Sequence, residues 1–333
     1  MANLVVTTGR RYIDIDGLAC VIAYKEIPEV PLIAVIAGPL NNSVTAKIRT
    51  WNLNFQKTLT EGDYDFVITD TSEKESLPYF VKPERVIEIY DHHFGFEKEW
   101  RDRLGDKAKI ESVGACATLI WEEFKARKGK CKISAVAANL LYTAIVSNTL
   151  NFQASVTTER DKKAFEELKA FVSLPEDWVR EYYRDQEADI YGNPEVAITN
   201  DTKMQMIEGR ECAVGQLELW RSKEFLESHL GEIEATLSGL NASCWFFTSP
   251  SISEGKNYIF TRDQSIKDML GRVIPIEFGS KDIGVTQKLW LRKEILKKIQ
   301  KGGTWNRNKL KKRALLLPGL GPGFYRLQKR CRK

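Results

Sequence analysis

The sequence predicts an α/β fold made of two domains, and three observations lead to that prediction. The chain has 333 residues, which is longer than a single core usually serves. In its first half, short apolar runs alternate with helical patterns, which indicates a largely parallel sheet covered on both faces. Gly192, Asn193 and Pro194 then break the regular pattern. We therefore expect a parallel-sheet domain over residues 1–188, a linker over 189–196, and a smaller α/β domain over 197–333.

The elements of the first domain follow from apolar runs and from capping residues. Apolar runs of strand length predict four strands, at residues 3–8, 31–37, 65–72 and 85–93. Helical patterns predict helices at residues 16–27 and 43–51, after Gly114, and at 133–146, 157–172 and 175–188. Ser173 can cap the last of these helices, with Pro175 in its first turn.

The second half has an α/β pattern of its own. Its apolar runs predict strands at residues 211–219, 242–250 and 256–261. Its amphipathic patterns predict helices at residues 222–240 and 285–302. These elements are enough for a second, smaller core.

The composition is that of an ordinary globular protein, with 43% hydrophobic and 29% charged residues. The first residues lack the long apolar stretch of a signal peptide, and no run approaches membrane-spanning length. Six cysteines are scattered without a C-x-x-C pair, which favours reduced thiols over disulfides or a thiolate zinc site. We therefore expect a cytoplasmic protein without a membrane segment.

The net charge of +5 hides an uneven distribution. Residues 284–333 contain sixteen Lys or Arg and one acid, Glu294, so the rest of the chain is acidic. Such a basic block is either a solvated tail or a surface that binds a polyanion such as phosphate, polyphosphate or nucleic acid.

Acids and histidines gather where the predicted strands end. Asp14 and Asp16 follow the first strand, Asp70 ends the third, and Asp91 with His92 ends the fourth. In an open parallel sheet, ligands collect outside the carboxyl ends of the strands, so these side chains should share one rim. Crowded carboxylates repel one another unless cations lie among them. Oxygen ligands plus imidazole suit Mn²⁺, Mg²⁺ or Co²⁺.

The order of these motifs resembles the DHH phosphoesterase superfamily. The matching stretches are DID at residues 14–16, TDTS with Asp70, DHH at residues 91–93, and SNTLNF at residues 147–152. The resemblance covers nearly the whole chain and is closest to the branch of the manganese-dependent family II inorganic pyrophosphatases and the exopolyphosphatases. It implies a catalytic domain that binds two metal ions, followed by a smaller phosphate-binding domain.

The resemblance also implies roles for single residues. Asp14, Asp16, Asp70, His92 and Asn148 match the metal-ligand positions. His93 would contact the substrate phosphate or protonate the leaving oxygen, and Asp91 would orient the histidines. Lys203 and the pair Lys312 and Arg313 match phosphate-binding positions of the second domain.

Two positions depart from the pattern of the resembled family. Where the pyrophosphatases have a histidine and the exopolyphosphatases an asparagine, this chain has Arg10, which cannot bind a cation and would instead face the anionic substrate. Asn148 replaces an aspartate that binds the second metal, and its carbonyl brings no negative charge. Both changes should weaken metal binding.

Three functions remain open at this point. The first is a two-metal phosphohydrolase that cleaves phosphoanhydride bonds of pyrophosphate or short polyphosphate. The second is a phosphodiesterase on nucleotides or short oligonucleotides. The glycine-rich GGH motif of those enzymes is absent, because Gly302 and Gly303 precede Thr304. The third is a phosphate or polyanion sensor that has lost metal ligands. The oligomeric state does not follow from the sequence.

Overall fold

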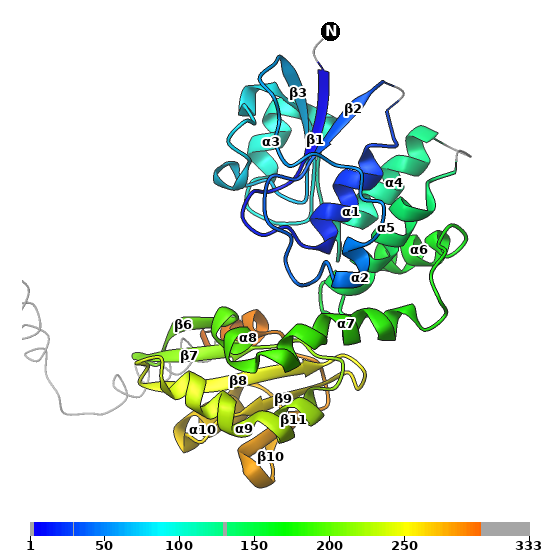
Figure 1. Cartoon of the computed structure of the whole chain (residues 1–333). Helices are drawn as coiled ribbons and strands as arrows, with labels where there is room; N and C mark the ends of the chain where they lie inside the picture. Colours follow the sequence, from blue (N-terminus) through cyan, green and yellow to red (C-terminus); the bar gives the residue numbers. More distant parts are fainter. Residues whose placement is uncertain (1–2, 29, 129–131, 301–333) are drawn as a thin grey trace, which may run out of the picture. The chain divides into compact units, whose positions relative to one another are not determined.

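The structure is a computed structural model that describes residues 3–28, 30–128 and 132–300 (Figure 1). It consists of two compact units. Residues 1–197 form the first unit together with two short segments, 218–228 and 251–255. The second unit contains residues 198–217, 229–250 and the chain from 256 onward. After leaving the first unit, the chain therefore returns to it twice. The sequence predicts a single linker between two continuous domains and does not predict these returns.

The first unit is built on a five-stranded sheet with the order β2-β1-β3-β4-β5. All four pairings are parallel, so the predicted parallel sheet is confirmed. α1 packs against α4 and α5, and α3 contacts β4 and β5 from the other side (Figure 1). The strands are β1 (Asn3–Thr7), β2 (Leu32–Val35), β3 (Tyr64–Thr69), β4 (Val86–Asp91) and β5 (Ala108–Ile110).

The helices of the first half begin mostly at capping side chains. Asp14 caps α1, Ser134 caps α5, and Thr158 forms a capping box with Asp161 at the start of α6. The helices are α1 (Ile15–Tyr24), α2 (Ala46–Arg49), α3 (Glu97–Leu104), α4 (Cys116–Lys128), α5 (Ala135–Asn148), α6 (Glu159–Leu168), α7 (Trp178–Gly192) and α8 (Pro194–Asn200).

The expected linker over 189–196 is mostly helical in the structure. α7 continues to Gly192, and α8 begins at Pro194. The glycine and the proline therefore separate two helices, because proline is well suited to the first turn of a helix and poorly suited to its interior. Gly192 and Pro194 do interrupt the regular structure, but they separate two consecutive helices and do not form an extended linker.

The second unit holds a six-stranded mixed sheet with the order β10-β11-β9-β8-β7-β6. β6 pairs antiparallel with β7, and β7 pairs parallel with β8. Its elements are β6 (Thr202–Ile207), β7 (Arg210–Gln216), β8 (Cys244–Ser251), β9 (Lys256–Phe260), β10 (Glu277–Phe278), β11 (Ile283–Thr286) and the helix α10 (Gln264–Val273). α9 (Ser222–Ser238) bends at His229, which has a non-helical φ of −125°. The two units divide between Ser228 and His229.

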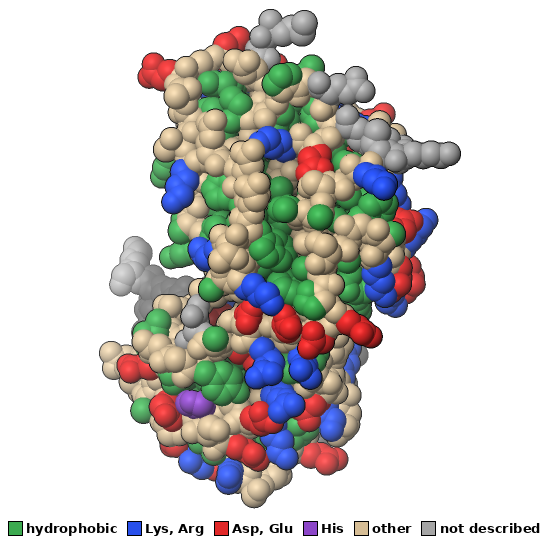
Figure 2. Space-filling model, turned by 45° about the vertical axis from the view of Figure 1, so that its right-hand side comes forward, with side chains coloured by type: hydrophobic (Ala, Val, Ile, Leu, Met, Phe, Trp, Pro, Cys, Tyr) green, Lys and Arg blue, Asp and Glu red, His purple; other side chains and the backbone are tan. Residues whose placement is uncertain are grey.

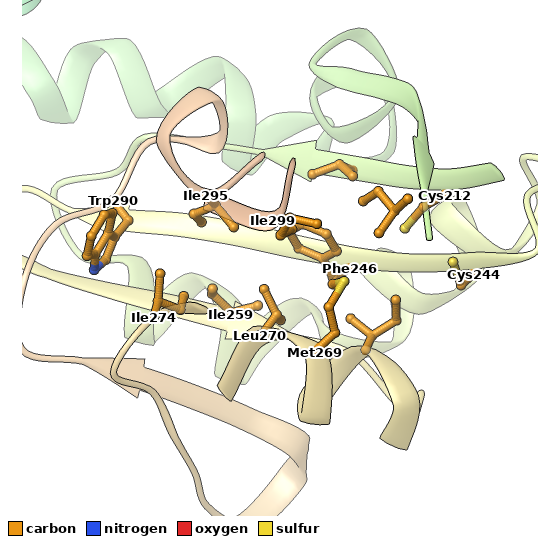
Figure 3. Close-up of a cluster of buried hydrophobic side chains, with 13 residues drawn as sticks. Cys212, Cys244, Phe246, Ile259, Met269, Leu270, Ile274, Trp290, Ile295 and Ile299 are labelled. Carbon is orange, nitrogen blue, oxygen red and sulfur yellow. The ribbon is translucent and has the colours of Figure 1, made fainter. Parts of the chain in front are cut away.

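The core of the second unit lies between its sheet and two helical segments (Figure 3). Phe246 and Ile259 from the sheet pack with Leu270 of α10 and with Ile295 and Ile299. The last two belong to a helical stretch over 292–300. The sequence predicts one helix over 285–302, whereas residues Ile283–Thr286 form the strand β11. The alternating residues of this segment suit a strand that pairs with β10 and β9, and this pattern competes with the helical one.

Arg292 connects the start of that last helix to the sheet of the second unit. Arg292 is 7% exposed, and its guanidinium donates to the Asp201 carboxylate at 2.7 Å and to the Val214 carbonyl at 3.0 Å. On the face seen in Figure 2, basic and acidic side chains are intermixed over the second unit. Most of the basic block predicted to bind polyanions, including Lys312 and Arg313, lies outside the described residues.

Candidate metal centre

The acidic side chains of the candidate site stand where neighbouring parallel strands end. After β1 a loop leads to Asp14, whose carboxylate accepts from Gly17 N at 2.9 Å and caps α1. Asp70 directly follows β3 and Asp91 is the last residue of β4. Asp70 has a φ of +58°, and its amide donates to Tyr90 O at 2.8 Å. This rare backbone conformation turns the chain at the strand end, a form of strain often found at functional sites.

Three side chains converge at the centre of this rim. His92 Nε2 lies 3.4 Å from Asp70 Oδ1 and 3.7 Å from Asp16 Oδ2. Asp70 Oδ1 is buried and has no hydrogen-bond partner among the described residues. A buried carboxylate oxygen is normally paired, so this atom is suited to bind a cation or a proton.

The other ring nitrogen of His92 fixes its tautomer. His92 Nδ1 lies 3.2 Å from the carbonyl oxygen of Val113. A carbonyl can only accept a hydrogen bond, so Nδ1 carries the proton and donates. The opposite nitrogen, Nε2, then faces Asp70 and Asp16. Metal-binding histidines are commonly held in this way, with one ring nitrogen bonded to a backbone carbonyl and the other directed at the site.

Asp16 is fully buried at the start of α1, and residues of α4 and α5 hold its carboxylate in place. Its carboxylate accepts from Cys116 N and Ala117 N at the beginning of α4, both at 2.8 Å. Asn148, the last residue of α5, donates its Nδ2 to Asp16 Oδ2 at 2.6 Å. Asn148 therefore contacts the site through a metal-ligand candidate, as its position in the sequence predicts.

The electrostatics of the cluster indicate that a positive charge belongs there. Burial raises the pKa of Asp16, although the charge of His92 opposes this effect. Burial also raises the pKa of Asp70 well above its usual range, and the charges of Asp16, Asp14 and Asp91 raise it further. A buried group of like charges that repel one another is stabilised when cations bind among them. The burial, the orphaned oxygen and the donor set thus fit a divalent ion.

Asp91 organises the turn that carries both histidines. One of its oxygens accepts from His92 N at 2.8 Å, from His93 N at 3.1 Å and from His93 Nδ1 at 2.8 Å. Burial opposes ionisation, but the hydrogen bond and charge of His93 outweigh it and lower the pKa of Asp91. Because His93 Nδ1 donates to Asp91, its Nε2 is available for another partner. The His93 side chain is 62% exposed.

A pocket of about 220 Å³ opens beside the acids. Its wall includes Asp14, Asp70, His93 and the three residues Arg10, Arg11 and Tyr12. The guanidinium of Arg10 donates from Nη2 to Glu75 O at 2.8 Å and from Nη1 to the hydroxyl of Tyr79. Arg10 therefore lines the pocket, and its guanidinium is hydrogen-bonded to Glu75 and Tyr79.

Lys203 lies in the second unit, exposed on β6 opposite Val214 of β7. The structure therefore brings Asp14, Asp16, Asp70, Asp91, His92, His93, Asn148 and Arg10 into one rim of the first unit. Sequence reasoning missed Arg11, Tyr12 and the Val113 carbonyl. Tyr12 follows the first strand, so its place in the chain was a usable signal, whereas no local pattern marks Val113.

Comparisons with known proteins agree with this geometry. No family model matches the sequence. The chain is 22% identical over 325 residues to a probable manganese-dependent inorganic pyrophosphatase of Clostridium acetobutylicum, covering 89% of this chain and 97% of that protein. It superposes on the crystal structure of a Methanococcus jannaschii putative family II inorganic pyrophosphatase with a TM-score of 0.59 and 19% identity, covering 91% and 99% of the two chains. The chain is related to the family II inorganic pyrophosphatases.

Part of the chain is also 32% identical over 217 residues to an A-adding tRNA nucleotidyltransferase of Aquifex aeolicus, covering 63% of this chain and 24% of that enzyme. None of the helices in the described residues combines the length and hydropathy needed to cross a bilayer.

Proposed function

We propose that the protein is a divalent-cation-dependent phosphohydrolase that cleaves phosphoanhydride bonds in pyrophosphate or short polyphosphate. The observation that carries the proposal is the buried Asp70 Oδ1, which has no hydrogen-bond partner among the described residues and lies 3.4 Å from His92 Nε2. It rests also on relatives that are named manganese-dependent inorganic pyrophosphatases. The buried free thiols of Cys20, Cys116, Cys212 and Cys244 agree with a cytoplasmic location, which stays part of the proposal.

Two ions, of Mn²⁺, Mg²⁺ or Co²⁺, would be held by Asp14, Asp16, Asp70, His92 and Asn148. Bound there, such ions lower the pKa of a coordinated water to near neutrality and neutralise charge on the phosphates. For Asn148 to contribute its carbonyl oxygen, the amide must turn over from its present bond to Asp16. Since an amide oxygen brings no charge, this second position should bind its ion weakly.

His93 is suited to handle the leaving oxygen. Asp91 fixes Nδ1 at 2.8 Å, so Nε2 can donate a proton or accept one at the mouth of the pocket. Asp91 is therefore a positioning residue, and His93 is the residue proposed to touch substrate.

Cationic residues would neutralise the phosphates that are not attacked. Arg10 and Arg11 line the pocket in the first unit. Lys203 is exposed in the second unit and can contact an anion. Lys312 and Arg313 are proposed to bind phosphate from the sequence alone. The proposed contact of the basic tail with a polyanion also rests on the sequence alone.

One experiment can distinguish the proposed function from two other candidate functions. The match to a tRNA nucleotidyltransferase favours a phosphodiesterase acting on nucleotides or short oligonucleotides as the second candidate. The partnered guanidinium of Arg10 and the uncharged Asn148 favour a binding protein without turnover. Phosphate release from pyrophosphate and tripolyphosphate, and mononucleotide release from a dinucleotide, should be measured with Mn²⁺, Mg²⁺ or Co²⁺, with a chelator as the metal-free control. Cleavage of pyrophosphate and tripolyphosphate but not of the dinucleotide supports the proposal. Cleavage of none of the three contradicts it.

Changing Asn148 to Asp is expected to tighten Mn²⁺ binding by about tenfold and to raise turnover. A carboxylate binds a hard cation better than an amide does. In the metal-free protein the new charge lies against Asp16, so Asn148→Asp should lower thermal stability before Mn²⁺ is added and enlarge the Mn²⁺-dependent rise in Tm. Titration calorimetry and thermal melts test this. Asn52→Asp, at an exposed position, makes the same charge change away from the site. Equal Mn²⁺ affinity in all three proteins would exclude Asn148 from the second metal position.

A further inference from the structure

Exposed aromatic side chains surround the candidate metal centre. Tyr12 is 79% exposed, Tyr79 89% and Phe94 68%. They are the three most exposed aromatic residues in the described part of the chain. Tyr12 lies after β1, Tyr79 after β3 and Phe94 after β4. Because these strands are parallel neighbours, the loops that follow them emerge at the same edge of the sheet as Asp14, Asp70 and the histidines.

Tyr79 is exposed and yet held in place. The guanidinium of Arg10 lies 4.2 Å from the centroid of its ring and also contacts its hydroxyl. Arg10 is itself anchored, since its Nη2 donates to Glu75 O at 2.8 Å and its backbone amide donates to Ser76 O at 2.9 Å. An aromatic ring fixed by a stacked arginine loses little conformational entropy on binding a flat ligand.

The fixed ring adjoins the pocket that contains the acids. Arg10 and Ser76 line that pocket, and so do Arg11 and Tyr12. A flat group stacked at the rim would place an attached phosphate chain beside two arginines and the metal-binding side chains. Pyrophosphate has no part that gains from an aromatic surface, because it is a small, fully solvated anion. Stacking on aromatic rings beside arginine is instead the usual way in which proteins bind nucleobases.

We propose that the site also accepts phosphoanhydrides that carry a nucleobase, that is, a nucleoside linked to the phosphoanhydride which the site cleaves. This inference rests on the proposed function and extends its substrate class. The base stacks on Tyr79 and Tyr12, and the phosphates enter the pocket. In hydrolysis of a nucleoside diphosphate, the oxygen of water bonds to one phosphorus. The bond from that phosphorus to the bridging oxygen breaks, and the bridging oxygen leaves with the electron pair and takes up a proton. The products are a nucleoside monophosphate and phosphate.

The test compares ADP with pyrophosphate, two phosphoanhydrides that differ by the nucleoside. The quantity measured is the ratio of kcat/KM for ADP to kcat/KM for pyrophosphate, with Mn²⁺ in the full-length protein. Tyr79→Ala is expected to lower this ratio by about tenfold, since it removes one stacking surface. Tyr79→Phe keeps the ring and loses only the hydroxyl contact to Arg10, so the ratio should stay near that of the parent. Tyr191→Ala, which removes a partly exposed tyrosine on α7, should leave the ratio unchanged.

The outcomes separate this inference from the proposed function. If pyrophosphate is cleaved and Tyr79→Ala does not change the ratio, the nucleobase inference fails while the phosphohydrolase proposal stands. If Tyr79→Phe lowers the ratio as much as Tyr79→Ala, the ring only supports Arg10 and the inference also fails. If neither substrate is cleaved with any metal, the proposed function fails and this inference falls with it.

Discussion

Replacement of His92 by alanine is expected to lower metal-dependent phosphate release by about a hundredfold or more and to weaken Mn²⁺ binding in parallel. The imidazole Nε2 faces Asp70 at 3.4 Å and Asp16 at 3.7 Å. Without the imidazole, the buried carboxylates of Asp70 and Asp16 lose the nitrogen that would bind a cation together with them. Calorimetric Mn²⁺ titration and a phosphate-release assay on the same preparation measure the two effects.

The third histidine of the chain provides a control for His92. His229 lies at the bend of α9, and we expect His229→Ala to keep the parent Mn²⁺ affinity. Circular dichroism of both variants checks that the fold is retained. Parent-level turnover in the His92→Ala protein would remove this histidine from the metal centre and, with it, the main support for the proposed function.

Asp161→Ala is expected to lower the free energy of unfolding by about 3 kcal/mol or more. The carboxylate is fully buried and accepts from Gly114 N at 2.9 Å and from Thr118 Oγ1 at 2.6 Å. It also accepts from the amide and hydroxyl of Thr158 at 2.8 and 2.7 Å. Removing it leaves several buried donors unpaired. Urea denaturation of the full-length chain measures the loss.

Glu159→Ala is the matched control for Asp161. It lies two residues away in the same helix, its side chain is 87% exposed, and it forms only a surface ion pair with Lys162. Its loss should change the free energy of unfolding by less than about 0.5 kcal/mol. Because Asp161 also fixes the segment before α4, whose first amides bind Asp16, its loss should weaken Mn²⁺ binding as well. Equal stability of the two variants would contradict the assigned role.

The acids of the site could be predicted because their position depends on topology. Once residues 3–8, 65–72 and 85–93 are recognised as parallel strands, Asp14, Asp70 and Asp91 must end at one edge. Contacts that depend on packing were not predictable. The bond from Asn148 to Asp16 joins α5 to α1 across 132 residues of sequence. The stacking of Arg10 on Tyr79 depends on the course of a loop that has no regular period.

The second unit was less predictable for a related reason. Its sheet is mixed and includes the two-residue strand β10 and the edge strand β6, which carry little apolar periodicity. Short strands at sheet edges are stabilised by their pairing partners more than by their own residues. The sequence therefore predicts the central strands β7, β8 and β9, which are apolar, and omits those at the edges.

The first unit is not a continuous piece of the chain. The Glu187 carboxylate in α7 accepts from Trp220 N, and the Tyr183 and Trp220 rings stack with centroids 5.5 Å apart. Trp220 belongs to the segment 218–228, which is made only after the first strands of the second unit. During synthesis the first unit thus cannot reach its final form until the ribosome has passed residue 255. A gene fragment that stops at residue 197 would encode a protein with an uncovered tyrosine face and a glutamate without its Trp220 partner, so activity assays need the whole chain.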